Sequence, residues 1–437
     1  MKVRGLIFVL LTSLCLLIFP QYKPWYNQYN FVYGTKAMAM GNAFTAVADD
    51  LTTVFWNPAG LAAKRNPEFY FAYQSESQVH EYDPQEKPVS NDTIQYNYKL
   101  SSKLQQINFF SVSAPAEFLK MKWGFALSYY RYIPYGFKGS AEEMLIYVRK
   151  SSNSKRTTVN FRGSEGLDVL AFSAAAGISE YFALGCTLQQ FFNSGSQHLQ
   201  TLNTEGEFHE QYNESLRGRN FIVGVMFRPF KTLSLGFTYH SGLKNKFDST
   251  LLSWEVEKPG IDVNLKAKSS LADVVIPSQY SLGASWQLVR WLKLSFDSSR
   301  IDWQKGTLQN YYNSETILPY PQKADFSSEQ KNIRNLRAGM EIDLPLRKWL
   351  LHLRGGWSAD KQLYVDRSDQ AVKISGYAAG IGCEFSHYLQ LEIAFQRQNT
   401  VWNENGYFNN RKEIASRYSA NLLKFSITYR FGHIFKD

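Results

Sequence analysis

Large apolar residues recur at every second position along most of the chain, and this period of two is the strongest constraint on its fold. After Met121, the large side chains of Trp123, Phe125 and Leu127 alternate with smaller neighbours. Successive side chains of a β-strand point to opposite faces, so the pattern predicts a strand with one apolar face. The alternation returns in about fourteen candidate strands. Their apolar positions include Leu188, Val223, Phe237, Leu282, Leu294, Leu353, Ile381, Ile393 and Phe425.

The links between these candidate strands alternate between short and long. Short links lie at 115–120, 178–181, 229–232, 288–291, 344–348 and 386–388, and long ones at 76–102, 133–166, 193–218, 242–277 and 301–333. Tight turns on one rim and long loops on the other are typical of an outer-membrane barrel, whereas a soluble β-sandwich does not require this alternation. Strands of about 11 residues, tilted by about 40°, would form an apolar band roughly 28 Å tall, which matches a bilayer.

Composition excludes two other classes of protein. The chain is 44% apolar and 20% charged, with a mean hydropathy of -0.33, which fits neither a disordered chain nor a polytopic helical membrane protein. Aromatic residues make up 16% of the chain, and this content suits pleated surfaces and membrane-interface girdles. Beyond the N-terminus, no stretch approaches the roughly 20 apolar residues of a spanning helix. A membrane-embedded form must therefore be a closed barrel, all-β and antiparallel.

The N-terminus has the layout of a secretory signal. Lys2 and Arg4 precede a weakly polar run over 5–19, so we expect residues 1–24 to be a signal peptide. The residues around Pro20 lack a small-x-small cleavage pattern, which places the cut anywhere from about position 20 to 30 and leaves an uncleaved anchor as the alternative.

The charge balance of 48 basic against 38 acidic residues, or +10, would attract a polyanion such as nucleic acid, phosphorylated lipid or lipopolysaccharide. The simpler explanation is that the excess positive charge lies on solvated loops. No long run of Lys and Arg occurs, so we expect no nucleic-acid partner.

The second face of the candidate strands is mostly polar or small, as the lumen of a barrel requires. It includes Lys293, Asp297, Arg337, Glu341, His352, Arg354, Glu392, Lys424 and Arg430. Because the signs are mixed, we expect most of these charges to pair across the lumen. The alternative is that Arg337, Arg354 or Lys424 binds the carboxylate of an otherwise apolar ligand. The sequence alone leaves both interpretations open.

A segment before the first strand is rich in small residues and carries a specific resemblance. It reads MGNAFTAVADD at 40–50 and WNPAGLA at 56–62. This run resembles the N-terminal hatch of the FadL-like family of long-chain fatty-acid outer-membrane transporters, which includes PorV-like relatives. The resemblance implies a hatch at 25–66 and a barrel with long extracellular loops at 67–437. Only Asp49, Asp50, Asn57, Pro58 and Ala59 map securely onto the hatch motif.

That family implies a fourteen-stranded barrel in the outer membrane of a diderm bacterium. The hatch would occlude the lumen, and hydrophobic molecules such as fatty acids would pass from the extracellular loops to an interior pocket. Release would follow a hatch rearrangement or a side opening. Expected partners are these molecules, outer-membrane lipid and the barrel assembly machinery. The alternative is a PorV-like component of a protein secretion system.

The hatch residues carried over by the resemblance are expected to have a structural and gating role. The carboxylates of Asp49 and Asp50 and the Asn57 amide would tie the hatch to lumen groups, or merely cap a short helix or turn.

Catalytic and metal-binding motifs are absent from the sequence. It contains no HExxH, P-loop, GxSxG or cysteine cluster, so we expect no enzyme activity, cofactor or metal. In one long link, Ser140 and Glu143 match a capping box, which predicts an amphipathic loop helix over 141–150. Pro134 and Gly136 mark a place where the third strand is expected to be distorted.

Overall fold

The computed structural model describes residues 33–84, 93–134, 136–148, 154–203, 206–258, 261–265, 269–302, 307–311, 332–365, 371–385, 387–405 and 413–432. The predicted signal peptide lies outside these residues. Among the described residues, no helix combines the length and the apolar character that a membrane crossing requires.

In the part of the chain that the structure describes, three short helical elements precede the strands: α2 (Thr35–Ala39), α3 (Thr53–Trp56) and the 3₁₀ helix η2 (Pro58–Ala63). The strands are β1 (Glu68–Pro84), β2 (Thr93–Phe118), β3 (Met121–Pro134), β4 (Lys138–Val148), β5 (Ser154–Gly177), β6 (Phe182–Phe192), β7 (Ser194–Asn203), β8 (Gly206–Leu216), β9 (Gly218–Phe230), β10 (Leu233–His240), β11 (Leu243–Lys258), β12 (Ile261–Leu265), β13 (Ser269–Ile276), β14 (Gln279–Val289), β15 (Leu292–Asp302), β16 (Thr307–Tyr311), β17 (Asn332–Leu346), β18 (Trp349–Val365), β19 (Ala371–Glu384), β20 (Leu389–Asn405) and β21 (Glu413–Arg430).

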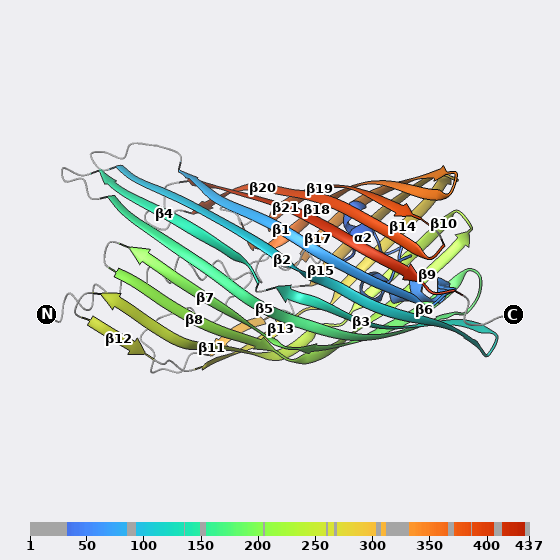
Figure 1. Cartoon of the computed structure of the whole chain (residues 1–437), viewed down its shortest axis with the longest axis horizontal. Helices are drawn as coiled ribbons and strands as arrows, with labels where there is room; N and C mark the ends of the chain where they lie inside the picture. Colours follow the sequence, from blue (N-terminus) through green and yellow to red (C-terminus); the bar gives the residue numbers. More distant parts are fainter. Residues whose placement is uncertain are drawn as a thin grey trace.

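The strands form one antiparallel sheet that closes on itself (Figure 1). Within the described residues the wall has 14 strand positions and one extra strand, which confirms the predicted all-β barrel. The ring closes where β1 pairs with β21, from Glu68 opposite Arg430 to Pro84 opposite Ile414. Because the first and last strands pair with each other, the ring of strands that crosses the membrane has no free edge.

Much of the region predicted as long links is also strand. The segments β4, β7, β8, β11, β13 and β16 prolong the wall beyond the expected strand ends, and β12 pairs with β11 alone. The predicted helix over 141–150 is wrong, because Lys138–Val148 is the strand β4, paired with both β2 and β5. Cross-strand pairing overrides the local helix signal here. The strand segments in the predicted long links lie beyond the lipid-facing band. They therefore lack the alternation of large apolar side chains from which the other strands were predicted.

The two faces of the wall have opposite character. The side chains of Leu282, Phe296 and Tyr377 are 62%, 58% and 60% exposed, and they point away from the lumen. Their neighbours Ser281 and Asp297 are buried inside. Exposure of this many large apolar side chains is stable only against lipid, so the outer face is the membrane-embedded surface.

The third position of the wall is interrupted where the sequence suggested. Strand β3 ends at Pro134 and β4 begins at Lys138, and both pair with β2 and β5. Next to the gap, the Gly163 amide donates to the Phe137 carbonyl at 2.7 Å. Proline lacks the amide proton that the ladder needs, which explains the break at this place.

We predict that nitroxide labels at Leu235 and Leu294 report a lipid environment, because both positions lie on the outward face of the wall. Electron paramagnetic resonance should find them accessible to oxygen and protected from a water-soluble nickel complex. A label at Lys348, exposed in the turn between β17 and β18, is the control and should show the reverse. Nickel accessibility at Leu235 and Leu294 equal to that at Lys348 would contradict the lipid-facing assignment.

Candidate functional site

The hatch lies inside the barrel, toward the end with the short turns (Figure 1). Its described part, residues 33–63, is almost wholly buried against the inner wall. Its backbone turns sharply at Gly41, Asn42 and Ala48, which have φ of 64°, 65° and 36°. Such left-handed conformations suit Gly and Asn and let a short segment double back within the lumen.

Inward-facing glycines form the seat of the hatch, which we call the glycine belt. It comprises Gly124, Gly185, Gly224, Gly236, Gly283, Gly339, Gly356 and Gly380. A Cβ at Gly356 would collide with the backbone of Gly41, and one at Gly224 with Asn57 and Pro58. Strand and hatch backbones therefore meet without an intervening side-chain layer, and the run of small residues in the hatch completes this close approach.

Asn57 joins two parts of the hatch to the wall. Its Nδ2 donates to the Thr45 carbonyl at 2.8 Å and to the Val225 carbonyl of β9 at 3.0 Å. Its Oδ1 accepts from the Ala59 amide at 3.2 Å, which caps η2 with Pro58 in the first turn. Asn57 is fully buried, so these bonds satisfy a polar side chain that water cannot reach.

Asp297 of β15 fixes the next turn of the hatch. Its Oδ2 accepts from the Phe44 and Thr45 amides, both at 2.8 Å. Hydrogen bonds from two consecutive amides to a buried carboxylate are charge-assisted and strong. This contact joins residues more than 250 positions apart.

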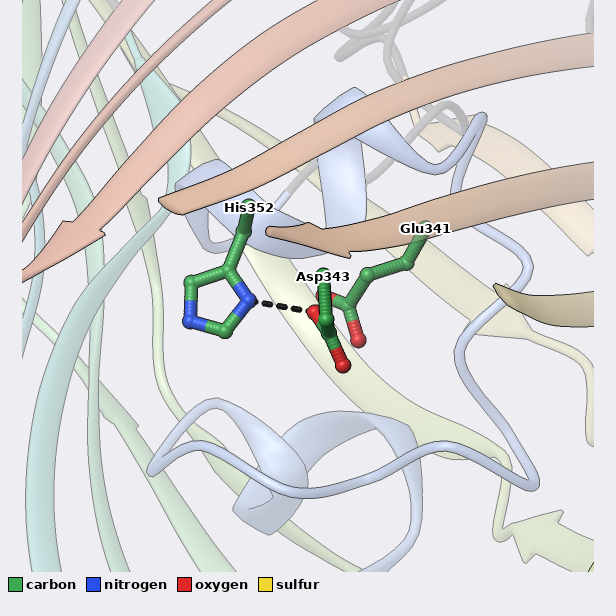
Figure 2. Close-up of side chains that lie close together, drawn as sticks. All are labelled: Glu341, Asp343 and His352. Atoms are coloured by element: carbon green, nitrogen blue, oxygen red, sulfur yellow. Dashed lines mark hydrogen bonds and ion pairs between the residues drawn. The ribbon is translucent and has the colours of Figure 1, made fainter. Parts of the chain in front are cut away.

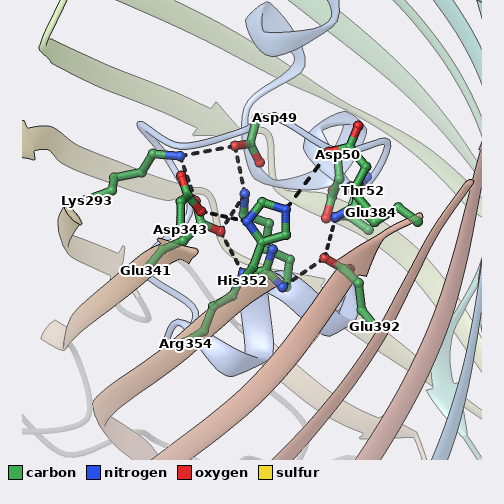
Figure 3. A network of polar contacts seen from close by, with 12 residues as sticks. Asp49, Asp50, Thr52, Lys293, Glu341, Asp343, His352, Arg354, Glu384 and Glu392 are labelled. Carbon is green, nitrogen blue, oxygen red and sulfur yellow. Dashed lines mark hydrogen bonds and ion pairs between the residues drawn. The ribbon is translucent and has the colours of Figure 1, made fainter. Parts of the chain in front are cut away.

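A network of ion pairs fastens the hatch at Glu341 of β17 (Figure 3). The Glu341 carboxylate contacts Lys36 of the hatch at 2.8 Å, Lys293 of β15 at 2.8 Å and Arg354 of β18 at 2.6 Å. Asp49 of the hatch contacts Lys36 at 2.9 Å and Lys293 at 3.6 Å. Lys36 and Asp49 thus reach wall residues of opposite charge, and the removal of Glu341 would leave the buried Lys36 without its ion pair to the wall.

Glu341 also lies beside Asp343 and His352, a trio whose ligand atoms are within 4.8 Å of one another (Figure 2). His352 Nδ1 is 2.6 Å from Asp343 Oδ1. We assign Glu341 to the ion-pair network and not to a metal centre, because three cationic side chains already surround its carboxylate and would repel a further cation.

Asp50 accepts hydrogen bonds from another residue of the hatch, Thr52. Its Oδ1 accepts from the Thr52 amide at 2.8 Å and from the Thr52 hydroxyl at 2.5 Å. Burial, together with the nearby Glu392 charge, raises the pKa of Asp50 from 3.8 to about 7. Asp50 thus caps a turn, whereas Asp49 reaches the wall.

The three predicted ligand-binding residues lie apart, each beside a polar partner. Arg337 contacts Asp360 at 3.0 Å and stacks 5.6 Å from the Trp56 ring of the hatch. Arg354 is held by Glu341 and by Glu392, the latter at 2.9 Å. Lys424 is fully buried and donates to Asn108 at 3.0 Å. The expected pairing of lumen charges is therefore observed for Arg337 and Arg354, while ligand binding by all three residues stays a prediction.

An aromatic cluster covers the hatch on the side of the long strands. Tyr33 and Phe55 of the hatch contact each other at 4.5 Å, and Tyr33 lies 4.9 Å from Tyr130 of β3. Tyr130 stacks on Phe109 of β2 at 5.3 Å. Because Tyr130 lies further from the short turns than Gly124 of the same strand, the lumen changes along β3 from a glycine seat to an apolar aromatic lining.

Sequence reasoning missed the wall residues that hold the hatch. Asp297 and Glu341 were placed on the lumen face, but nothing distinguished them from other inward charges. Their hatch partners, Phe44, Thr45 and Lys36, follow only from the folded structure.

We predict that Gly356→Ala displaces the hatch, because the new methyl group would collide with the Gly41 backbone. Overpacking of this kind costs about 1–3 kcal/mol. Planar-bilayer recordings should show a higher ion conductance, and protease should cut the hatch faster. Gly355→Ala is the matched control. Apart from its neighbours in sequence, a Cβ at Gly355 would meet only Met340 Cε, at 4.0 Å. Equal conductance in both variants and the unmodified protein would refute the tight seat.

We also predict that the hatch loosens as pH rises from about 4 to 7. Seated, Asp50 keeps its proton to about pH 7, whereas an exposed Asp releases it near 3.8, so rising pH favours the displaced hatch over this window and no further above it. Hydrogen exchange of hatch amides measures the change. Asp50→Asn, which is neutral at every pH, should flatten this dependence, and an unaltered profile in that variant would assign the effect to another group.

Comparison with known proteins places these features in a family. The model described as outer membrane protein transport protein (OMPP1/FadL/TodX) matches residues 28–309. No curated protein sequence matches the chain.

Solved structures share the fold at low sequence identity. A FadL homologue of Pseudomonas aeruginosa is 13% identical with a TM-score of 0.62, covering 91% of this chain and 98% of its own. The toluene transporter TbuX of Ralstonia pickettii is 13% identical with a TM-score of 0.57, covering 92% and 98%. The toluene transporter TodX of Pseudomonas putida is 14% identical with a TM-score of 0.57, covering 91% and 98%. With a family model spanning more than half of its residues, the chain belongs to the OMPP1/FadL/TodX family of outer membrane transport proteins.

Proposed function

We propose that the protein is a channel through which hydrophobic small molecules, including long-chain fatty acids, cross the outer membrane, with the hatch as its gate. The observation that carries this proposal is the combination of an apolar aromatic lining with a close-fitting hatch beneath it. Tyr33 and Phe55 supply the hatch side of this lining, and Tyr130 and Phe109 the wall side. A water-filled porin lumen would instead be polar at this level.

The contacts of the hatch support a gating role. The contacts with the wall are short-range and polar at Asn57 and Asp297, and they are ionic between Lys36 and Glu341 and between Asp49 and Lys293. Each is worth a few kcal/mol at most, and all are lost when the hatch moves away from the wall. A hatch held by contacts of this kind can be displaced without unfolding the barrel, whose backbone ladder is separate.

Arg337 is the predicted ligand residue best placed to meet a substrate carboxylate, because it lies at the junction of wall and hatch. Its guanidinium stacks on Trp56 of the hatch and is held by Asp360 of the wall. A fatty-acid carboxylate would compete with Asp360 for this guanidinium. An uncharged hydrocarbon would pass without that exchange. We therefore propose that Arg337 serves acidic substrates and is dispensable for neutral ones.

The runner-up function, a component of protein secretion, fits the hatch motif alone. The similar solved structures include toluene transporters, and this similarity favours passage of hydrophobic molecules. Uptake and secretion differ in what they require of the lumen lining, since a surface that binds exported proteins needs no apolar path through the wall.

We predict that cells carrying the protein take up labelled oleate and toluene faster than cells without it. Arg337→Ala should lower oleate uptake about tenfold, the value of one charge-assisted hydrogen bond, and leave toluene uptake unchanged. Arg347→Ala is the control, because Arg347 is exposed in the turn before β18. Equal loss for both substrates would refute a carboxylate-specific role. Uptake of neither substrate, with secretion proteins co-purifying, would favour the runner-up.

A further inference from the structure

Two buried polar side chains converge over Gly376 on the inner face of the wall: Ser358 of β18 and Gln396 of β20. A Cβ at Gly376 would lie 2.5 Å from Ser358 Oγ and 3.0 Å from Gln396 Nε2. Both atoms therefore lean over the space that a larger residue of β19 would fill. We call these two side chains the polar pair.

Neither Ser358 Oγ nor Gln396 Nε2 has a hydrogen-bond partner among the described residues, although the two residues are only 1% and 0% exposed. The Gln396 side-chain oxygen accepts from Gln398 Nε2 at 3.5 Å, which leaves the Gln396 Nε2 group to donate elsewhere. A buried polar group without a partner destabilises a fold, so each such group in a native structure calls for an explanation.

The polar pair differs from the other inward-facing hydroxyls by its convergence. On the inner face of β2 and β3, Ser111 and Ser128 lie 2.7 Å apart and satisfy each other. Within the described residues, single hydroxyls without a partner also occur at Thr238 and Ser299. At the polar pair, by contrast, an amide donor and a hydroxyl meet at one point, as a site for an oxygen atom requires.

The polar pair lies next to Arg337. Cross-strand register places Arg337 opposite Ser358, and Ser358 opposite Gly376. The Arg337 guanidinium turns toward Asp360 and the Trp56 ring. A charged and an uncharged polar group thus lie side by side on neighbouring strands, and they would suit different ligand groups.

The polar pair also borders the hatch. Ala394 is the next inward residue of β20, and Leu422 of β21 is directly opposite Gln396. Both belong to one buried apolar cluster with Met38 and Ala39 of α2. The seated hatch therefore completes the apolar surface around the pair, and a displacement of α2 would open this surface to a molecule in the lumen.

We propose that the polar pair binds the uncharged oxygen group of a hydrophobic molecule, so that the substrates of the channel include long-chain alcohols. A ligand hydroxyl accepts from Gln396 Nε2 and donates to Ser358 Oγ, which satisfies both atoms at once. The apolar cluster beside the pair accommodates the hydrocarbon chain. A hydrocarbon without oxygen leaves the pair unsatisfied, and a site built for a hydroxyl discriminates against such an analogue. This inference rests on the proposed transport function, although binding at the pair is measured separately.

The test compares the uptake of labelled oleyl alcohol, the matching octadecene, which lacks the hydroxyl, and oleate. Cells without the protein give the background. The unmodified protein should take up oleyl alcohol roughly tenfold faster than octadecene. The double variant Ser358→Ala/Gln396→Met should lower alcohol uptake about tenfold, the value of two hydrogen bonds between uncharged groups, and leave oleate uptake unchanged.

Ser128→Ala is the matched control, because it removes an inward hydroxyl that already has a protein partner. It should leave the uptake of oleyl alcohol unchanged. Folding of each variant is checked by heat-dependent mobility on gels. An equal loss of alcohol uptake in Ser128→Ala and in the double variant would overturn the proposal.

Native mass spectrometry of the purified full-length protein counts bound oleyl alcohol and separates the site from transport. Alcohol that is bound by the unmodified protein and lost from the double variant supports the site, even where cells take up neither alcohol nor oleate, a result that would refute the proposed function. Equal alcohol binding by the double variant and the unmodified protein would overturn the site and leave oleate transport intact. Equal uptake of oleyl alcohol and octadecene would also overturn it.

Discussion

Closure of the backbone hydrogen-bond ladder is the constraint on which the rest of this structure depends. Lipid offers no partner for an unpaired amide or carbonyl, so the wall must meet itself, as it does where β1 pairs with β21. Closure then divides every strand into a lipid face and a lumen face. The period of two in the sequence is the direct consequence, and so is an interior that needs to be filled.

The hatch fills that interior by two means with different physical roles. The glycine belt allows backbone to lie on backbone, which gives shape complementarity but little adhesion of its own. Direction and attachment come from a few polar groups, chiefly Asn57, Asp297 and Glu341. Shape determines where the hatch can lie, and charge determines how firmly it stays. The two can therefore be altered separately by substitution.

The barrel could be predicted from the sequence because its signal is local. Trp123, Phe125 and Leu127 alternate within a few residues of one another, and the tight turns follow within short distances. The strand β4 was missed because its partners in β2 and β5 are remote, whereas Ser140 and Glu143 offered a misleading local helix signal.

The contacts between the hatch and the wall could be predicted even less well from local sequence signals. The hatch could be recognised by its motif, and Asp297 and Glu341 could be assigned to the lumen face. Which of them meets Phe44 or Lys36 depends on how the hatch winds inside a closed wall, and no periodicity encodes that path.

The prolonged wall has a consequence for where a molecule first meets the protein. Strand β5 has 24 residues, which at about 3.3 Å each and a tilt of about 40° reach roughly 60 Å. A bilayer occupies about half of that height. The remainder projects beyond the membrane surface, so the mouth of the barrel opens well above the outer leaflet and a molecule that enters there meets the protein before it meets the lipid.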